Sequence, residues 1–338
     1  MNPRWAMLAI LALPRAASSA EPVLQRFTFE EPHMGTKFRI VLYAPDSATA
    51  QRASKSAFAR VAELNAIMSD YDPKSELMQL CRRFATASGE PAPISADLFK
   101  VLAKAQEVAR HSGGTFDVTI GPLVQLWRQS RRTQKLPASD EIEEAKRRVG
   151  YAKIELDAAR RTVRLKTPGM QLDLGGIAKG FAADEMLAAM KKHGITRALA
   201  GAGGDVAVAD PPPGEPGWKI DVAPLTKAKP EHSLRLVNAA VSTSGDAQQF
   251  VLIDGVRYSH VVDPRTGLGM TGRRSVSVIA PNGITADSMT KAVMLMEPAR
   301  ALELIEATPH AATLIITLDA DGTESIRMSK RMHAVISK

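Results

Sequence analysis

Apolar residues recur along the chain in two patterns, one typical of helices and one typical of strands. The helical pattern is clearest in a stripe spaced four, three and four residues apart, formed by Ala57, Val61, Leu64 and Met68. Asp46 and Ser47 precede this stripe and are expected to cap its helix. A second helix is predicted between Ser95 and the glycines at 113 and 114. Further helices are predicted at 177–192 and 287–296, and strands at 37–42, 151–173 (a pair), 218–222, 235–242, 249–253, 275–280 and 312–318.

These elements come in groups of helices and groups of strands, without regular strand–helix alternation, which favours the α+β fold class. The Pro-Pro-Pro-Gly run at 211–214 interrupts the pattern, but strand-like residues resume at once. We therefore interpret it as a surface loop inside one domain that covers residues 21–338. The charged stretch 128–148 is predicted to lie on the surface and to be partly helical.

The first twenty residues have the pattern of a secretory signal peptide. Arg4 supplies a positive start, residues 6–13 are apolar, and the small residues at 18–20 offer a cleavage site. The apolar run is too short to span a bilayer. An amphipathic or disordered tail is the alternative. No cysteine lies near the cleavage point, so no lipid anchor is expected, and the sequence predicts an exported, periplasmic protein.

The composition is that of a globular protein with an excess of basic residues. The 338 residues carry a formal net charge of +8 without a basic block, and only 5% are aromatic. No nucleic-acid partner is therefore expected, whereas a phosphate-bearing ligand suits the charge. The single cysteine, Cys81, excludes an internal disulfide and a Cys/His metal cluster. The motifs of serine hydrolases, zinc proteases and P-loop kinases are absent.

Two segments carry groups that can act on a phosphate-bearing ligand. Residues 172–180 end a strand and open a helix, and Gly175 and Gly176 let the backbone approach an anion there. Lys179 follows one turn into that helix. His260 precedes an Asp-Pro turn, where it can move a proton near neutral pH, although the segment alone slightly favours an ordinary histidine at a strand end.

Other segments are open to a structural interpretation. Asp287, Thr290 and Lys291 are expected on one helix face, where the Asp and Thr oxygens could hold a hard cation such as Mg²⁺. In isolation, Asp287 is better explained as a helix N-cap. Phe116, which lies beside Asp117, is open to the alternative interpretation that it packs in the core. The glycines at 203 and 204 are followed by a strand, which argues against a dinucleotide-binding loop.

Taken in order along the chain, these segments resemble the FAD:protein FMN transferase (ApbE) family. The motifs that carry the resemblance are residues 34–36 (MGT), 68–77 (MSDYDPKSEL), 114–117 (GTFD), 121–123 (GPL) with Trp127, 173–180 (DLGGIAKG), 203–205 (GGD), 242–245 (STSG), 260–267 (HVVDPRTG) and 286–287 (AD). Each motif alone is weak, but their shared order across nearly all of residues 21–338 is specific.

The resemblance implies an α+β fold related to the T-fold, with strands and flanking helices around an FAD cleft. It implies transfer of FMN from FAD to a Thr or Ser hydroxyl of a target protein, with release of AMP. The expected partner is a flavin-carrying subunit of a membrane redox complex, and the membrane would be met only through that partner. By position, FAD would be lined by Met34, Tyr71, Thr115, Phe116, Asp117, Asp173, Lys179 and Val261.

The resemblance also implies His260 as the catalytic histidine and Mg²⁺ held by the Gly176 carbonyl and Asp287. The family has a Thr four residues after the Asp, but this chain has Lys291 there and Thr290 one position earlier. Either the helix turns to use Thr290, or Lys291 replaces part of the metal's charge. Two alternatives to transfer follow from this departure: an FAD pyrophosphatase, and a non-catalytic protein that stores or senses FAD.

Overall fold

The computed structural model describes residues 23–222, 225, 232–245, 250–319 and 321–337. Its centre is an eight-stranded sheet in which every neighbouring pair is antiparallel. In spatial order the strands are β1 (Gln25–His33), β2 (Thr36–Ala44), β6 (Ala198–Ala202), β7 (Asp205–Val208), β10 (Ala239–Gly245), β14 (Arg273–Ala280), β15 (Ala312–Leu318) and β16 (Glu324–Met328). The predicted signal peptide, residues 1–20, lies outside the described residues.

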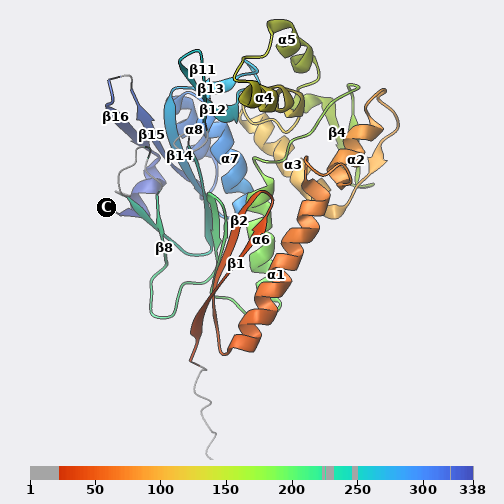
Figure 1. Cartoon of the computed structure of the whole chain (residues 1–338). Helices are drawn as coiled ribbons and strands as arrows, with labels where there is room; N and C mark the ends of the chain where they lie inside the picture. Colours follow the sequence, from red (N-terminus) through yellow and green to blue (C-terminus); the bar gives the residue numbers. More distant parts are fainter. Residues whose placement is uncertain (1–22, 223–224, 226–231, 246–249, 320, 338) are drawn as a thin grey trace, which may run out of the picture.

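Side-chain alternation in the strands separates two cores on opposite faces of this sheet. In β2, Phe38 and Ile40 belong to the larger core, whereas Val41 belongs to the smaller one, because successive residues point to opposite faces. The larger core is covered by the helices α1 (Ser47–Met68), α6 (Ala178–Lys191) and α7 (Gly283–Leu295), with α8 (Pro298–Ala307) beside them (Figure 1). Helices on one face of an antiparallel sheet confirm the predicted α+β class.

The smaller core lies under a three-stranded sheet of β8 (Trp218–Asp221), β9 (Ser233–Leu236) and β17 (Ile336–Ser337), next to the 3₁₀ helix η2 (Lys330–Ala334). The sequence predicts one strand at 235–242. The chain instead turns at Asn238, which adopts a left-handed φ of 46°, and divides this stretch between β9 and β10. The prediction of a single strand was therefore wrong: the stretch forms two strands, because an Asn can take the left-handed conformation that a turn requires.

The predicted helix caps are confirmed for two helices and corrected for a third. The side chain of Asp46 accepts a hydrogen bond from the Thr49 backbone N–H at 2.7 Å, and Ser95 caps α3 (Ala96–His111). The predicted stripe of α1 is buried throughout. Helix α7, however, is capped by Asn282 and begins four residues before Asp287. Asp287 is therefore not an N-cap, which removes the structural explanation that its segment alone had favoured.

The remaining elements lie beside the large sheet. A small sheet joins β3 (Ala92–Pro93), β5 (Thr162–Leu165) and β4 (Ile154–Asp157), with η1 (Tyr151–Lys153), α2 (Glu76–Arg83) and α3 nearby. The charged stretch 128–148 is partly helical, as predicted, because most of it falls in α4 (Gly121–Thr133) and α5 (Ser139–Arg147). Beside α4 lies a third three-stranded sheet, of β11 (Phe250–Ile253), β12 (Val256–Val262) and β13 (Gly269–Thr271) (Figure 1).

No helix in the described part of the chain combines the length and the apolar content needed to span a membrane.

Candidate functional site

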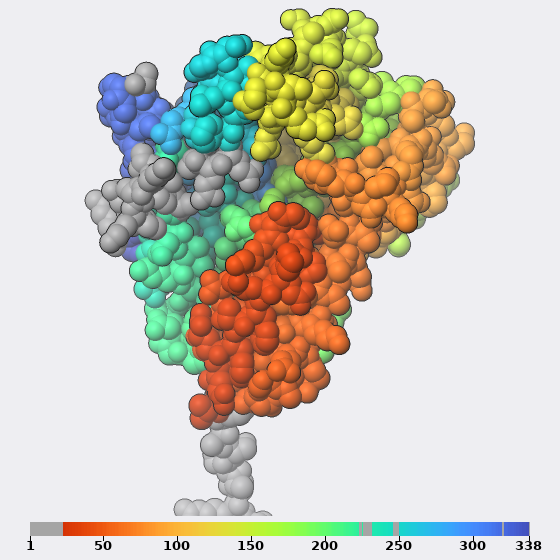
Figure 2. All heavy atoms as spheres, in the orientation of Figure 1, coloured from red at the N-terminus to blue at the C-terminus, as the bar shows by residue number. Residues whose placement is uncertain are grey.

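A single cavity of about 1940 Å³ brings together most of the residues that the sequence singled out. Figure 2 shows the surface hollowed between α4, drawn in yellow, and the β1–β2 hairpin, drawn in red. Eleven of the thirteen candidate residues line the cavity: Met34, Tyr71, Thr115, Phe116, Asp117, Asp173, Gly176, Lys179, His260, Val261 and Lys291. The other two, Asp287 and Thr290, are fully buried outside its lining.

Lys179 lies at the second residue of α6, where the glycine-containing turn before the helix places it in the cavity wall. Its Nζ donates a hydrogen bond to the Gly175 carbonyl at 2.9 Å and lies 3.4 Å from Asp205 Oδ2. Burial alone would lower the pKa of Lys179, but the nearby Asp287 and Asp205 carboxylates outweigh it and raise that pKa. Lys179 therefore presents a permanent positive charge.

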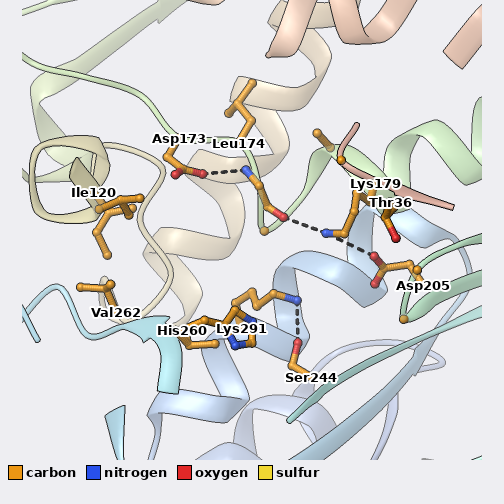
Figure 3. Close-up of a pocket in the computed structure, with 18 of the residues that line it drawn as sticks. Thr36, Ile120, Asp173, Leu174, Lys179, Asp205, Ser244, His260, Val262 and Lys291 are labelled. Atoms are coloured by element: carbon orange, nitrogen blue, oxygen red, sulfur yellow. Dashed lines mark hydrogen bonds and ion pairs between the residues drawn. The ribbon is translucent and has the colours of Figure 1, made fainter. Parts of the chain in front are cut away.

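Lys291 presents a second ammonium group from α7. Its Nζ donates to Ser244 Oγ at 2.6 Å and to Asp287 Oδ1 at 3.1 Å. Figure 3 shows the ammonium groups of Lys179 and Lys291 directed to the same part of the cavity. Both ammonium groups can donate charge-assisted hydrogen bonds to the oxygens of an anion such as a pyrophosphate.

Asp287 lies beneath the two lysines and binds both of them. Its Oδ2 accepts the Gly180 backbone N–H at 3.1 Å and lies 3.8 Å from the Nζ of Lys179. Burial by itself would raise the pKa of Asp287, but the charges of Lys179 and Lys291 outweigh it and keep that pKa below its ordinary value. The buried carboxylate is therefore ionised and fully partnered by cationic and N–H donors.

Thr290 does not share the cavity-facing position of Lys291. Its hydroxyl lies 2.6 Å from the Ala286 carbonyl and 3.2 Å from the Ser242 carbonyl, so it can donate its proton to either. Thr290 is fully buried and faces β10, because one residue along a helix rotates the side chain by about 100°. The expectation that α7 turns to bring Thr290 toward the metal position is not met.

The residues expected to hold Mg²⁺ do not fit that ion. Magnesium requires oxygen ligands at about 2.0–2.1 Å, and an ammonium group supplies none. The Lys291 stem instead packs on Gly176, with Cγ 3.0 Å from the position a Gly176 β-carbon would take, while its head binds Asp287. A divalent cation on Asp287 would therefore lie beside two ammonium groups. No group of three His, Cys, Asp or Glu residues suited to a metal occurs in the described ranges.

An aromatic surface lines another part of the cavity. The Tyr71 side chain is exposed, with 77% of the residue accessible, and the guanidinium of Arg128 lies 4.2 Å from its ring centroid. Arg128 also donates to Asp70 and, at 3.4 Å, to Asp173. A Tyr ring held in this way can stack on a planar ligand ring. The sequence alone indicates no role for Arg128, because it lies at the start of a polar stretch that resembles a solvated surface.

Asp117 secures the loop that carries Thr115 and Phe116. Its Oδ1 accepts the Thr119 backbone N–H at 2.8 Å, and its Oδ2 accepts the Tyr151 backbone N–H at 2.7 Å. Burial raises the pKa of Asp117 against these hydrogen bonds. Asp117 therefore ties the cavity loop to the segment that leads into β4.

His260 lies in β12 just before the predicted turn, and hydrogen bonds within the turn hold its shape. The Gly267 backbone N–H donates to the Asp263 carbonyl at 2.8 Å, and Arg265 Nε donates to Asp263 Oδ1 at 2.9 Å. Arg265 Nη2 also reaches the Leu295 carbonyl at the end of α7 at 2.9 Å. The turn therefore fixes the end of β12 relative to α7, the helix that carries Lys291.

Asp205 and Ser244 are site residues to which sequence reasoning gave no role. Asp205 is buried, accepts a hydrogen bond from Ser242 Oγ and faces Lys179. Burial raises the pKa of Asp205, and the Asp287 carboxylate raises it further. Both residues lie in motifs that carried the family resemblance, at 203–205 and 242–245. Membership of these two motifs was the signal that the sequence offered for both residues.

The fold and the site together form a cavity suited to a large anionic ligand with a planar ring, lined by two ammonium groups and a histidine. The model of the ApbE family matches residues 34–315, and the chain belongs to this family.

Curated relatives and solved structures agree with this assignment. The FAD:protein FMN transferase of Haemophilus influenzae is 32% identical over 298 residues, which cover 85% of each chain. That of Vibrio cholerae is 28% identical over 327 residues, or 94% of each chain. The flavin transferase ApbE structure from Vibrio cholerae has a TM-score of 0.82 at 27% identity and covers 93% of this chain and 100% of its own. The ApbE protein of Thermotoga maritima reaches 0.81 at 28% identity, over 92% and 99%. The predicted ApbE-like fold is confirmed.

Proposed function

We propose that this protein transfers FMN from FAD to a Thr or Ser hydroxyl of a target flavoprotein and releases AMP. The observation that carries the proposal is that Lys179, Lys291 and His260 line one cavity in a chain of the ApbE family. Pockets for drug-sized ligands measure about 300–1,000 Å³, so a cavity of about 1940 Å³ suits a dinucleotide.

Lys179, Lys291, Asp205 and Asp287 form the charged floor of the cavity. This floor suits the pyrophosphate of FAD. Lys179 and Lys291 contribute two ammonium groups, and phosphoryl transfer depends mainly on positioning and on neutralising charge at the phosphate oxygens. No divalent cation enters this account, because Gly176, Asp287 and Lys291 do not form a metal site.

The exposed face of Tyr71, braced by Arg128, suits one of the planar rings of FAD. An aromatic ring that stacks on a base contributes about 1–3 kcal/mol to binding. Together with the charged floor, this surface orients the dinucleotide along the cavity.

The transfer step exchanges one phosphorus–oxygen bond for another. The acceptor oxygen bonds to the phosphorus on the FMN side, and the bond from that phosphorus to the bridging oxygen breaks. The bridging oxygen leaves with AMP. The acceptor hydroxyl loses its proton, and His260 in the cavity wall takes it, as a general base does near neutral pH.

The target and the compartment belong to the same proposal. The partner we propose is a flavin-carrying subunit of a membrane redox complex. Export to the periplasm is supported by the signal-like pattern of residues 1–20, with its positive start, short apolar core and small residues.

The test measures the mass of an acceptor protein. The protein is incubated with FAD and a flavoprotein carrying the acceptor Thr, and AMP is quantified in parallel. Transfer predicts a mass gain of one FMN on the acceptor. AMP and free FMN without a mass gain would identify an FAD pyrophosphatase, and bound but intact FAD would identify a flavin-binding protein.

Two lysines of the same helix supply matched variants. Lys179→Met removes a charge from the cavity, whereas Lys191→Met removes one from the exposed end of α6. We expect Lys179→Met to lower the transfer rate by about 100-fold, the scale of one electrostatic donor, and Lys191→Met to leave it unchanged. Equal rates in both variants would reject the proposed use of the cavity floor.

A further inference from the structure

Lys291 occupies the space between the two residues expected to bind a metal. Its Cγ lies 3.0 Å from the β-carbon position of Gly176, and its Nζ lies 3.1 Å from Asp287 Oδ1. The second Asp287 oxygen is bonded to the Gly180 N–H and faces Lys179. The position next to Asp287 is therefore filled by a side chain of this protein.

The charges at the cavity floor are already balanced without a metal. Lys179 and Lys291 carry two positive charges, and Asp205 and Asp287 can carry two negative charges. A divalent cation added on Asp287 would meet two ammonium groups at short range and would be repelled. The charge pattern therefore disfavours a metal and requires none to stabilise Asp287.

The ammonium of Lys291 also retains the capacity to bind a ligand. A lysine has three N–H donors, and Ser244 and Asp287 accept two of them. Lys291 lines the cavity and its side chain is 18% exposed. A third donor is thus left for a phosphate oxygen, and both protein partners fix the direction of the side chain.

The Thr290 hydroxyl cannot serve as the metal ligand that Lys291 does not provide. Its hydroxyl is buried against the carbonyls of Ala286 and Ser242, on the side of α7 that packs on β10. The only residue of this pair that reaches the cavity is Lys291.

We propose that the ε-ammonium of Lys291 replaces the divalent cation at this site, so that the protein transfers FMN without a bound metal. This inference rests on the proposed function. The ammonium supplies one positive charge rather than two, but it is covalently attached and always in place. During transfer it stabilises the charge on the pyrophosphate oxygens as the bond to AMP breaks.

The test compares transfer in EDTA with transfer in excess Mg²⁺, for the full protein and three variants. We expect wild-type rates to agree within about twofold in the two buffers. Lys291→Thr should transfer slowly in EDTA and gain about tenfold or more with Mg²⁺, because the cation position is vacated. Lys291→Met should be slow in both buffers. Lys191→Thr, at the exposed end of α6, is the matched control and should behave as the wild type.

A direct binding measurement decides the inference independently of turnover. Mn²⁺ is titrated into each protein saturated with FAD, and free Mn²⁺ is followed by electron paramagnetic resonance. We expect Lys291→Thr to bind Mn²⁺ about tenfold more tightly than the wild type.

Two results would overturn the inference: wild-type transfer that EDTA abolishes and Mg²⁺ restores, or Mn²⁺ binding that is equal in the wild type and in Lys291→Thr. Absence of transfer in both buffers would reject the proposed function instead, and the Mn²⁺ titration would still decide whether Lys291 holds the cation position.

Discussion

A β-carbon on Gly180 would lie 2.1 Å from the carbonyl oxygen of Gly283, so the helices α6 and α7 touch backbone to backbone. The same position would lie 2.7 Å from the Asp287 β-carbon. This close approach allows the Gly180 N–H to reach the Asp287 carboxylate and sets Lys179 and Lys291 opposite each other. The two glycines therefore position the charged floor of the cavity.

Gly180→Ala should destabilise the protein by about 3 kcal/mol, at the upper end of overpacking penalties, because the contact is with rigid backbone. Chemical denaturation measures the change. Gly89→Ala is the control, since no atom lies within 4 Å of the added carbon, and it should change stability by less than about 0.5 kcal/mol. Equal stabilities of the two variants would contradict the helix contact.

Asp184 should make stability fall as pH rises through the weakly acidic range. Its oxygens accept the N–H groups of Gly283 and Ile284 at 2.6 and 2.9 Å, yet burial raises its pKa from 3.8 to about 6. Between these values the folded protein binds more protons than the unfolded chain. The contribution of Asp184 to the free energy of unfolding therefore decreases with pH in that window and stays level above it.

The variant Asp184→Asn isolates this contribution from those of other carboxylates. The unfolding free energy of the wild type minus that of the variant should fall by about 1–3 kcal/mol between pH 4 and pH 7. Urea denaturation at several pH values gives this difference. A difference that is constant, or that rises with pH, would show that the pKa of Asp184 is not raised.

Tyr71 should bind a ring of FAD through its exposed face. Tyr71→Ala is expected to raise the Kd for FAD about tenfold, equivalent to about 1.4 kcal/mol, since stacking on a base contributes that much or more. Tyr71→Phe keeps the ring and should bind FAD as the wild type does. Quenching of flavin fluorescence measures both. An unchanged Kd in Tyr71→Ala would place the rings of FAD elsewhere.

His260 should act in the chemical step and not in binding. His260→Ala is expected to lower kcat for transfer by about 100-fold or more, in the range of general base catalysis, with an unchanged Kd for FAD. His193→Ala, on the exposed surface after α6, is the control and should match the wild type. The proton-acceptor role would be lost if His260→Ala retained full transfer.

Local sequence patterns correctly predicted the helix features that depend on only a few neighbouring residues. The Asp46 and Ser95 caps and the α1 stripe are of this kind, because capping and amphipathic spacing are properties of one segment. Helix α7 is buried on nearly all sides, so no apolar stripe marks where it begins. For that reason the sequence predicts the start of this helix too late, at residue 287, and favours Asp287 as its cap.

The site itself needed the tertiary structure in two places. Which of Thr290 and Lys291 faces the cavity depends on the rotation of α7, which its packing on β10 and β14 determines. Arg128 gains a role only because α4 brings it over Tyr71, a residue 57 positions away in the chain. The ordered motifs identified the family, but contacts between distant segments decide what each residue can do.

The most direct test of the account is the ratio of AMP released to FMN attached, measured on the same sample of acceptor protein and FAD. The account predicts one AMP for each FMN bound covalently to an acceptor hydroxyl, since a single bond exchange produces both. Release of AMP without attached FMN, or attachment without AMP, would contradict FMN transfer as the activity of this cavity.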